Sequence, residues 1–98
     1  MRGVSDTSPI SNLASIGRLA LLRSHFSQIW IPSAVSIELA SHPDAAARQA
    51  VRGAIKEEWI LPVSVAPSHF LNVLNSQLHR GEAEAIALAA ALNSGASY

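Results

Sequence analysis

Three short strand-like segments are each followed by a helix-like segment, and this alternation limits the folds that the chain can adopt. The strand candidates span Val4–Asp6, Gln28–Ile31 and Trp59–Val65, and the last two are rich in β-branched and aromatic residues. After each of them, apolar residues recur three or four positions apart, as on one face of a helix. Strands that alternate with helices usually run parallel, because each helix returns the chain to the starting edge of the sheet. We therefore expect an α/β domain built from βαβ units.

Helix boundaries follow from glycine, proline and polar residues. Gly17 interrupts the apolar spacing between Ile10 and Phe26, so two short helices are expected there. Pro32 and Ser33 open the helix that follows the second strand. Further helices are expected after Pro43, at Ser68–Leu78 and at Glu82–Leu92, the last one preceded by a break at His79, Arg80 and Gly81.

The end of the chain leaves the predicted series of strands incomplete. The last helix is expected to finish at Asn93, Ser94 and Gly95, and a helix at this point should lead to a fourth parallel strand. Too few residues follow to form one. A chain of 98 residues that is 49% hydrophobic supports one core. We expect a single domain over residues 1–98, incomplete at its C-terminal end and lacking at least one strand.

Charge and cysteine content exclude several classes of protein. Seven Lys and Arg residues balance seven Asp and Glu residues, so any binding to a nucleic acid must be local. The absence of cysteine excludes disulfides and thiolate metal sites, and it fits a cytoplasmic protein. Neither a signal peptide nor an apolar run long enough for a membrane span is present, so we expect a soluble protein without membrane contacts.

Three acidic residues stand singly in otherwise apolar surroundings: Asp6, Glu38 and Glu82. Carboxylates gathered from separate strand and helix ends repel one another, and a divalent cation is the usual partner that stabilises such a cluster. The layout therefore predicts a metal site with hard oxygen ligands.

Each of the first two acids also has an ordinary structural explanation. Asp6 follows a strand, where open parallel sheets place ligand chemistry, but it equally suits the N-cap of the next helix. Glu38 lies between Ile37 and Leu39, where a carboxylate facing the apolar side alone would be costly. An exposed Glu38 on the polar face of its helix is the alternative.

Two glutamates compete for the third position. Glu82 and Glu84 follow Gly81 at a helix start, where the helix dipole and unpaired backbone N–H groups favour negative charge. Because they lie two positions apart on a helix, their carboxylates point in different directions. We choose Glu82 as the third acid and keep Glu84 as a supporting candidate.

Three strings of residues together carry a family resemblance. They are Val4-Ser5-Asp6-Thr7-Ser8-Pro9, then Ile31-Pro32-Ser33-Ala34-Val35 followed by Glu38-Leu39, and finally His79-Arg80-Gly81-Glu82-Ala83-Glu84-Ala85-Ile86-Ala87-Leu88-Ala89. In this order and spacing they resemble the PIN domain, and in particular its VapC-like bacterial branch. The resemblance implies a doubly wound parallel sheet with helices on both faces, dependence on Mg²⁺ or Mn²⁺, and cleavage of RNA. It also implies a toxin role opposed by a cognate antitoxin.

The resemblance assigns roles to residues of this chain. The family's catalytic and metal-binding acids fall on Asp6, Glu38 and Glu82, although the third is often an aspartate in the family. Thr7 and Ser8 match polar positions beside the first acid, where a hydroxyl orients a ligand or a metal-bound water. The chain departs from the family at its end, because PIN domains typically supply one or two more aspartates after a strand that would follow Tyr98.

The implied activity is metal-assisted hydrolysis of RNA, in which the metal activates a water molecule. Arg80 is the first candidate for a phosphate contact, with Arg18 and Arg23 behind it, although the sequence favours an ordinary surface charge for each of them. Two alternatives stay open: a non-catalytic PIN-derived module that binds an antitoxin or forms a homo-oligomer, and a fragment without activity.

Overall fold

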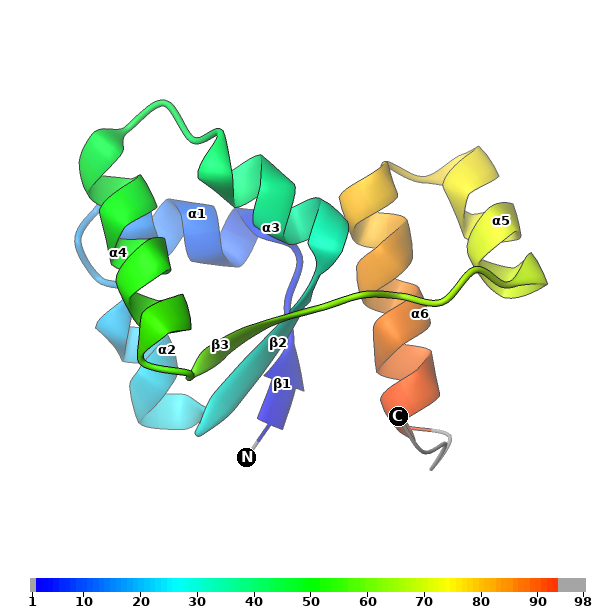
Figure 1. The fold of residues 1–98 in the computed structure, drawn as a ribbon, viewed down its shortest axis with the longest axis horizontal. Helices are drawn as coiled ribbons and strands as arrows, with labels where there is room; N and C mark the ends of the chain where they lie inside the picture. The colour runs from blue at the N-terminus through cyan, green and yellow to red at the C-terminus, as the bar shows by residue number, and fades with distance from the viewer. Residues whose placement is uncertain (1, 94–98) are drawn as a thin grey trace.

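The computed structural model describes residues 2–93, which form a parallel sheet and a set of helices (Figure 1). In chain order the elements are β1 (Arg2–Val4), α1 (Thr7–Ser15), α2 (Ala20–His25), β2 (Gln28–Pro32), α3 (Ser33–Ala40), α4 (Ala45–Lys56), β3 (Ile60–Val63), α5 (His69–Gln77) and α6 (Arg80–Asn93). The strands lie in the order β1-β2-β3, and both pairings are parallel. The predicted α/β fold with a parallel sheet is confirmed.

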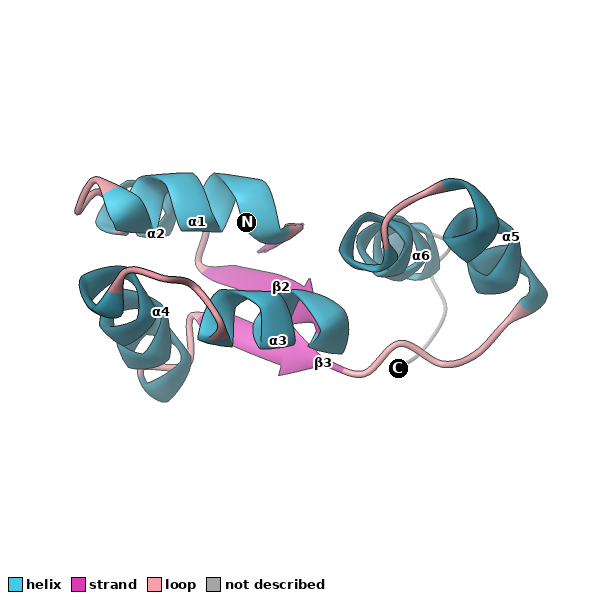
Figure 2. Cartoon of the chain, turned by 90° about the horizontal axis from the view of Figure 1, so that it is seen from above, coloured by secondary structure: helices cyan, strands magenta, loops and turns pink. Residues whose placement is uncertain are grey.

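Helices cover both faces of the sheet, as Figure 2 shows from above. The main core lies on one face. Residues two apart on a strand point the same way, and Ile29 and Ile31 of β2 belong to one buried cluster with residues of α1 and α4. On the other face, α6 packs against β1 and β2, and α5 packs on α6. A second, smaller core of Leu71, Ala83 and Ala87 joins α5 to α6.

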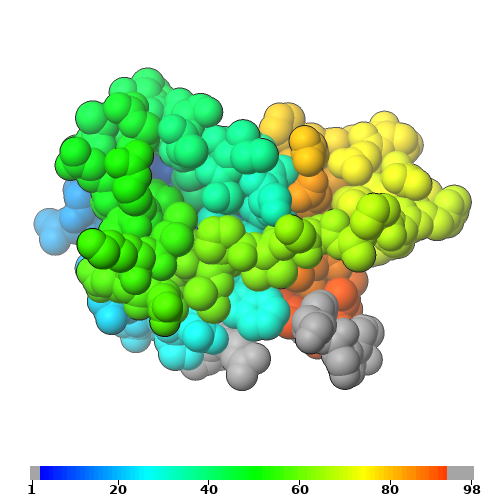
Figure 3. Space-filling view, viewed as in Figure 1, coloured from blue at the N-terminus to red at the C-terminus, as the bar shows by residue number. Residues whose placement is uncertain are grey.

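The carboxyl ends of the strands are where several elements meet. Pro32 ends β2 and is at the same time the N-cap of α3, so this helix starts at the edge of the sheet. α3 contacts both α1 and α6 and therefore bridges the two helical layers. In the space-filling view, the first turn of α6 lies directly against α3, although the two are far apart in the sequence (Figure 3). Parallel sheets commonly place their chemistry at this edge.

Several predicted boundaries are displaced. The first strand ends at Val4, so Asp6 lies outside it, and the third strand ends at Val63 and not at Val65. The last helix begins at Arg80, which makes the expected break part of the helix. The reason is that the N–H of Ala83 already donates to the carbonyl of His79 at 2.9 Å, which closes the first helical turn there.

Other expectations are met or lie outside the described region. Gly17 separates α1 from α2 with a φ of 70°, a left-handed conformation that glycine adopts without strain. The predicted helix end at Ser94 and Gly95 lies outside the described residues, as does any strand after it. None of the helices within residues 2–93 has the length and apolar character needed to cross a bilayer.

Candidate functional site

A polar pocket of about 300 Å³ opens at the carboxyl edge of the sheet. Its walls come from the start of α1, from α3, and from the start of α6 with the residue before it. The lining residues are Asp6, Thr7, Ser8, Glu38, His79, Gly81 and Glu82. The structure thus brings together the three acids and the two hydroxyl residues that the sequence had singled out.

Asp6 occupies the N-cap position of α1 without acting as a cap. Its side chain accepts no hydrogen bond from the first turn of the helix. The chain's other polar N-caps behave differently, because Asp44 accepts from the N–H of Ala46 and Ser68 accepts from the N–H of Leu71, both at 3.0 Å. Capping is the usual reason for an aspartate at this position, and it does not explain Asp6. Its carboxylate remains available to the pocket.

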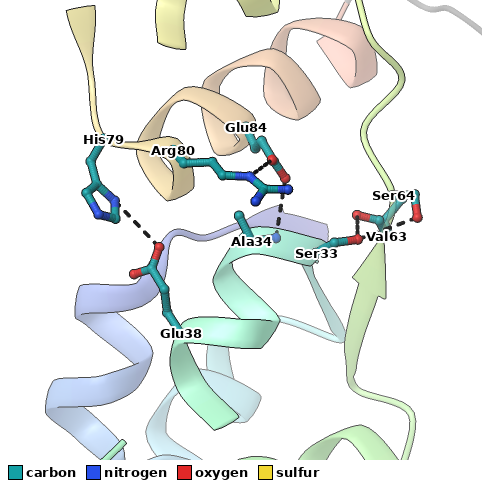
Figure 4. A network of polar contacts seen from close by, with 8 residues as sticks. All are labelled: Ser33, Ala34, Glu38, Val63, Ser64, His79, Arg80 and Glu84. Atoms are coloured by element: carbon teal, nitrogen blue, oxygen red, sulfur yellow. Dashed lines mark hydrogen bonds and ion pairs between the residues drawn. The ribbon is translucent and has the colours of Figure 1, made fainter. Parts of the chain in front are cut away.

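Glu38 is held on the opposite side of the pocket by residues from two other elements. The hydroxyl of Thr7 donates to Oε2 of Glu38 at 2.8 Å. Nδ1 of His79 lies 3.5 Å from Oε1 of Glu38 (Figure 4). Its side chain is about one third exposed, at 33%. The sequence left two arrangements open for Glu38, one facing the apolar side and one exposed to solvent. The structure shows an intermediate case, because Glu38 is partly exposed and has two polar partners.

Two lining residues were not expected from the sequence. The sequence placed His79 and Gly81 only in the break before the last helix, with no role in the site. Gly81 is buried, and a Cβ built on it would lie 2.6 Å from Oε1 of Glu38. A glycine placed directly before an acid, inside a run that otherwise suits a helix, was the available signal for this close approach.

The two competing glutamates of α6 separate as their spacing predicts. Glu82 is exposed and lines the polar pocket together with Asp6. Glu84 is buried and does not line it. Its carboxylate accepts hydrogen bonds from the backbone N–H of Ala34 at 3.3 Å and from Nε of Arg80 at 2.9 Å (Figure 4).

The candidate phosphate contacts differ in their distance from the pocket. Arg80 directly follows the lining residue His79 in the chain but does not itself line the pocket, and 68% of its side chain is exposed although its Nε donates to Glu84. Arg23 instead pairs with Glu57 at 2.6 Å and lies over the ring of Trp59. Neither Arg23 nor Arg18 lines the pocket.

A serine and a histidine also approach each other elsewhere, without the features of a nucleophilic pair. Oγ of Ser15 lies 3.1 Å from Nε2 of His42, but the same hydroxyl donates to the carbonyl of Ser11 at 2.8 Å. Nδ1 of His42 accepts from the backbone N–H of Asp44, and no carboxylate of the described residues bonds to the ring. Because the hydroxyl hydrogen is already used, this contact joins α1 to the turn before α4 and does not activate the serine.

The donor set of the polar pocket fits a hard divalent cation. Carboxylates and hydroxyls are the oxygen ligands that Mg²⁺ and Mn²⁺ prefer, and the chain has no cysteine. The carboxylate of Asp6, which the helix does not use, is the clearest sign of this fit. As the side chains lie here, no group of three or more His, Asp and Glu residues within 2–93 is arranged to hold a metal ion.

Comparison with known proteins identifies the family. A sequence profile described as PIN domain matches residues 2–96. No curated protein and no solved structure gave a significant match. PIN domains generally use divalent metals, in agreement with the oxygen donors around the pocket. Because the profile covers nearly the whole chain, the protein belongs to the PIN domain family.

Proposed function

We propose that this protein is a metal-dependent ribonuclease in which Asp6, Glu38 and Glu82 hold Mg²⁺ or Mn²⁺. The observation that carries the proposal is the carboxylate of Asp6, which stands at a helix N-cap without capping and lines one polar pocket with the other two acids. When bound, the metal would supply an activated water and stabilise the negative charge that develops on the phosphate.

The remaining residues of the pocket have supporting roles in this proposal. Thr7 orients Glu38 through its hydrogen bond, and the hydroxyl of Ser8 is placed to contact a ligand. Arg80, which is largely exposed and directly follows the lining residue His79, supplies positive charge for an RNA phosphate. Carboxylates alone would repel a polyanion, so we expect the metal to be required for RNA binding as well as for cleavage.

The finer assignment is a VapC-like bacterial toxin that acts on cytoplasmic RNA and is neutralised by an antitoxin encoded beside it. It is supported by the resemblance of the three sequence strings and by the family match. Growth arrest on expression, relieved by co-expression of the neighbouring gene, would support this assignment. Normal growth together with RNase activity in vitro would leave a nuclease that is not a toxin.

The direct test is cleavage of a labelled RNA by the purified chain with Mn²⁺ or with EDTA. Cleavage is expected with Mn²⁺ alone, and Asp6→Asn should reduce it by at least about 100-fold, more than the loss of an outer-shell partner usually costs. Glu57→Gln is the matched control, because it removes a carboxylate charge far from the pocket. Cleavage that survives Asp6→Asn would contradict the proposal.

A second candidate is a non-catalytic module that binds another protein or forms a homo-oligomer. Exposed apolar side chains favour it, since Phe70 and Val73 of α5 are each about half exposed, at 49% and 47%. A mass in solution greater than that of one chain, combined with absence of Mn²⁺ binding, would support this module over the nuclease.

A further inference from the structure

Glu84 is the only charged residue that is buried within the described part of the chain, with 7% of its surface exposed. Burying a carboxylate is costly unless hydrogen bonds compensate for the lost water. Here both oxygens are used, one by Ala34 of α3 and the other by Arg80 of α6. The lining of the polar pocket does not include Glu84, so another role must explain it.

The contact with Ala34 compensates for a missing cap. The first N–H groups of a helix have no partner within the helix and are usually satisfied by a polar side chain at the N-cap. The N-cap of α3 is Pro32, which has no side-chain acceptor and makes no cap bond. Glu84 supplies the missing acceptor from α6, and its negative charge also suits the positive end of α3.

This bond lies on the face of α3 that carries Glu38 and on the face of α6 that carries Gly81. Ala34 and Glu38 are one turn apart on α3 and therefore share a face. On α6, Gly81 is about one turn before Glu84, and it lies against Glu38. Two neighbouring contacts, Glu84 with Ala34 and Gly81 with Glu38, thus join the same two helices.

We infer that Glu84 is a positioning residue for the site: it fixes α3 against the first turn of α6, so that Glu38 faces the same pocket as Glu82. The inference rests on the proposed function, since those two acids are the intended metal ligands. Glu84 itself contacts neither the metal nor the RNA. It acts through the placement of Glu38.

The experiment compares Mn²⁺ affinity and folding stability in Glu84 variants of the full chain. Glu84→Ala should weaken Mn²⁺ binding by about 10- to 100-fold, the range that loss of an outer-shell partner usually causes. Glu84→Gln should keep most of the affinity, because its amide oxygen still accepts from the N–H of Ala34. Glu57→Ala, which removes the carboxylate of an exposed ion pair remote from the pocket, should leave the affinity unchanged.

A second comparison separates positioning from a purely structural role. In a Pro32→Ser background, α3 has a cap of its own, so adding Glu84→Ala should cost little further stability. The loss of Mn²⁺ affinity should nevertheless persist, because a local cap does not join α3 to α6. Recovery of both properties together would overturn the inference. Should Glu84→Ala fail to fold, Glu84→Asp makes the same comparison, since its shorter side chain does not span the distance to Ala34.

The outcomes also separate this inference from the proposed function. If the wild-type chain binds Mn²⁺ and Glu84→Ala binds it equally well, only the role of Glu84 is overturned. If the wild-type chain binds no Mn²⁺, the proposed function fails and the inference fails with it. Amide exchange at Ala34 gives a readout that does not need metal, and it should become faster in Glu84→Ala than in Glu84→Gln.

Discussion

Gly81 at the start of α6 lies so close to Glu38 of α3 that a Cβ at this position would come within 2.6 Å of the carboxylate oxygen Oε1. The next nearest atoms that the Cβ would meet also belong to α3. Any side chain here must therefore displace Glu38 or push the two helices apart. The backbone of α6 reaches the pocket because this residue is glycine.

Gly81→Ala is predicted to damage the site although alanine favours helices. In an ordinary helix interior the change stabilises by about 1 kcal/mol. Here the new methyl group must move the carboxylate of Glu38, so we expect Mn²⁺-dependent RNA cleavage to fall by at least about tenfold, as when a supporting partner of a metal ligand is lost. Cleavage rates and urea unfolding would measure the two effects.

Gly53 provides the matched control for this prediction. It lies within α4, and a Cβ built on it meets nothing within 4 Å. Gly53→Ala should raise the free energy of unfolding by roughly 0.5–1 kcal/mol and leave cleavage unchanged. If the two alanine variants behave alike, the contact between Gly81 and Glu38 has no functional importance.

Asp6 and Asp44 are predicted to respond in opposite ways to replacement by alanine. Asp44 caps α4 through the N–H of Ala46, so Asp44→Ala should lower the free energy of unfolding by about 1 kcal/mol and leave activity intact. Asp6 caps nothing, so Asp6→Ala should abolish activity with little loss of stability. Thermal unfolding and RNA cleavage measured on both variants test this. Equal destabilisation by the two changes would show that Asp6 is an ordinary cap.

Thr7 is predicted to act through its hydroxyl alone. It donates to Oε2 of Glu38 at 2.8 Å, a bond that fixes the orientation of that carboxylate. Thr7→Ala should reduce Mn²⁺ affinity by about 10- to 100-fold, and Thr7→Ser should stay close to wild type because the donor is kept. Calorimetric titration with Mn²⁺ distinguishes them. Similar losses in both variants would point to packing of the methyl group as the cause.

Removal of metal should change stability as well as activity. A ligand that binds only the folded state stabilises it by about 2.7 kcal/mol at a free concentration 100 times its Kd. Mn²⁺ should therefore raise the unfolding temperature of the wild-type chain, and EDTA should reverse the rise. The same titration on Asp6→Asn is the control. A rise of equal size in that variant would show that Mn²⁺ binds elsewhere.

The sequence was sufficient to predict the fold class, because periodicity and turn residues act locally. Strand composition in Gln28–Ile31 and the Pro32-Ser33 helix start both correspond to observed elements. Boundaries were less predictable where two local preferences compete. Glycine disfavours a helix, but Gly81 lies in the first turn of α6. The N–H groups of a first turn have no partner within the helix, so glycine is tolerated there.

The lining of the pocket was only partly predictable. The spacing of Glu82 and Glu84 showed that one of them must turn away, but it could not show what Glu84 would bond to. Its partner Ala34 is distant in the sequence, and the N–H of Ala34 is open to such an acceptor because Pro32 supplies no cap for α3. The contact of His79 with Glu38 likewise depends on how two helices pack, which is a tertiary property that no local pattern carries.

The most direct test of the central claim follows the amide signals of the ¹⁵N-labelled chain during titration with Mn²⁺, whose paramagnetism broadens signals from nearby nuclei. The account predicts that broadening begins at Asp6, Thr7, Ser8, Glu38, Gly81 and Glu82 and spreads outward from them. Broadening that begins instead at exposed carboxylates remote from the pocket, such as Glu57 and Glu58, or that never becomes localised, would contradict a metal site shared by Asp6, Glu38 and Glu82.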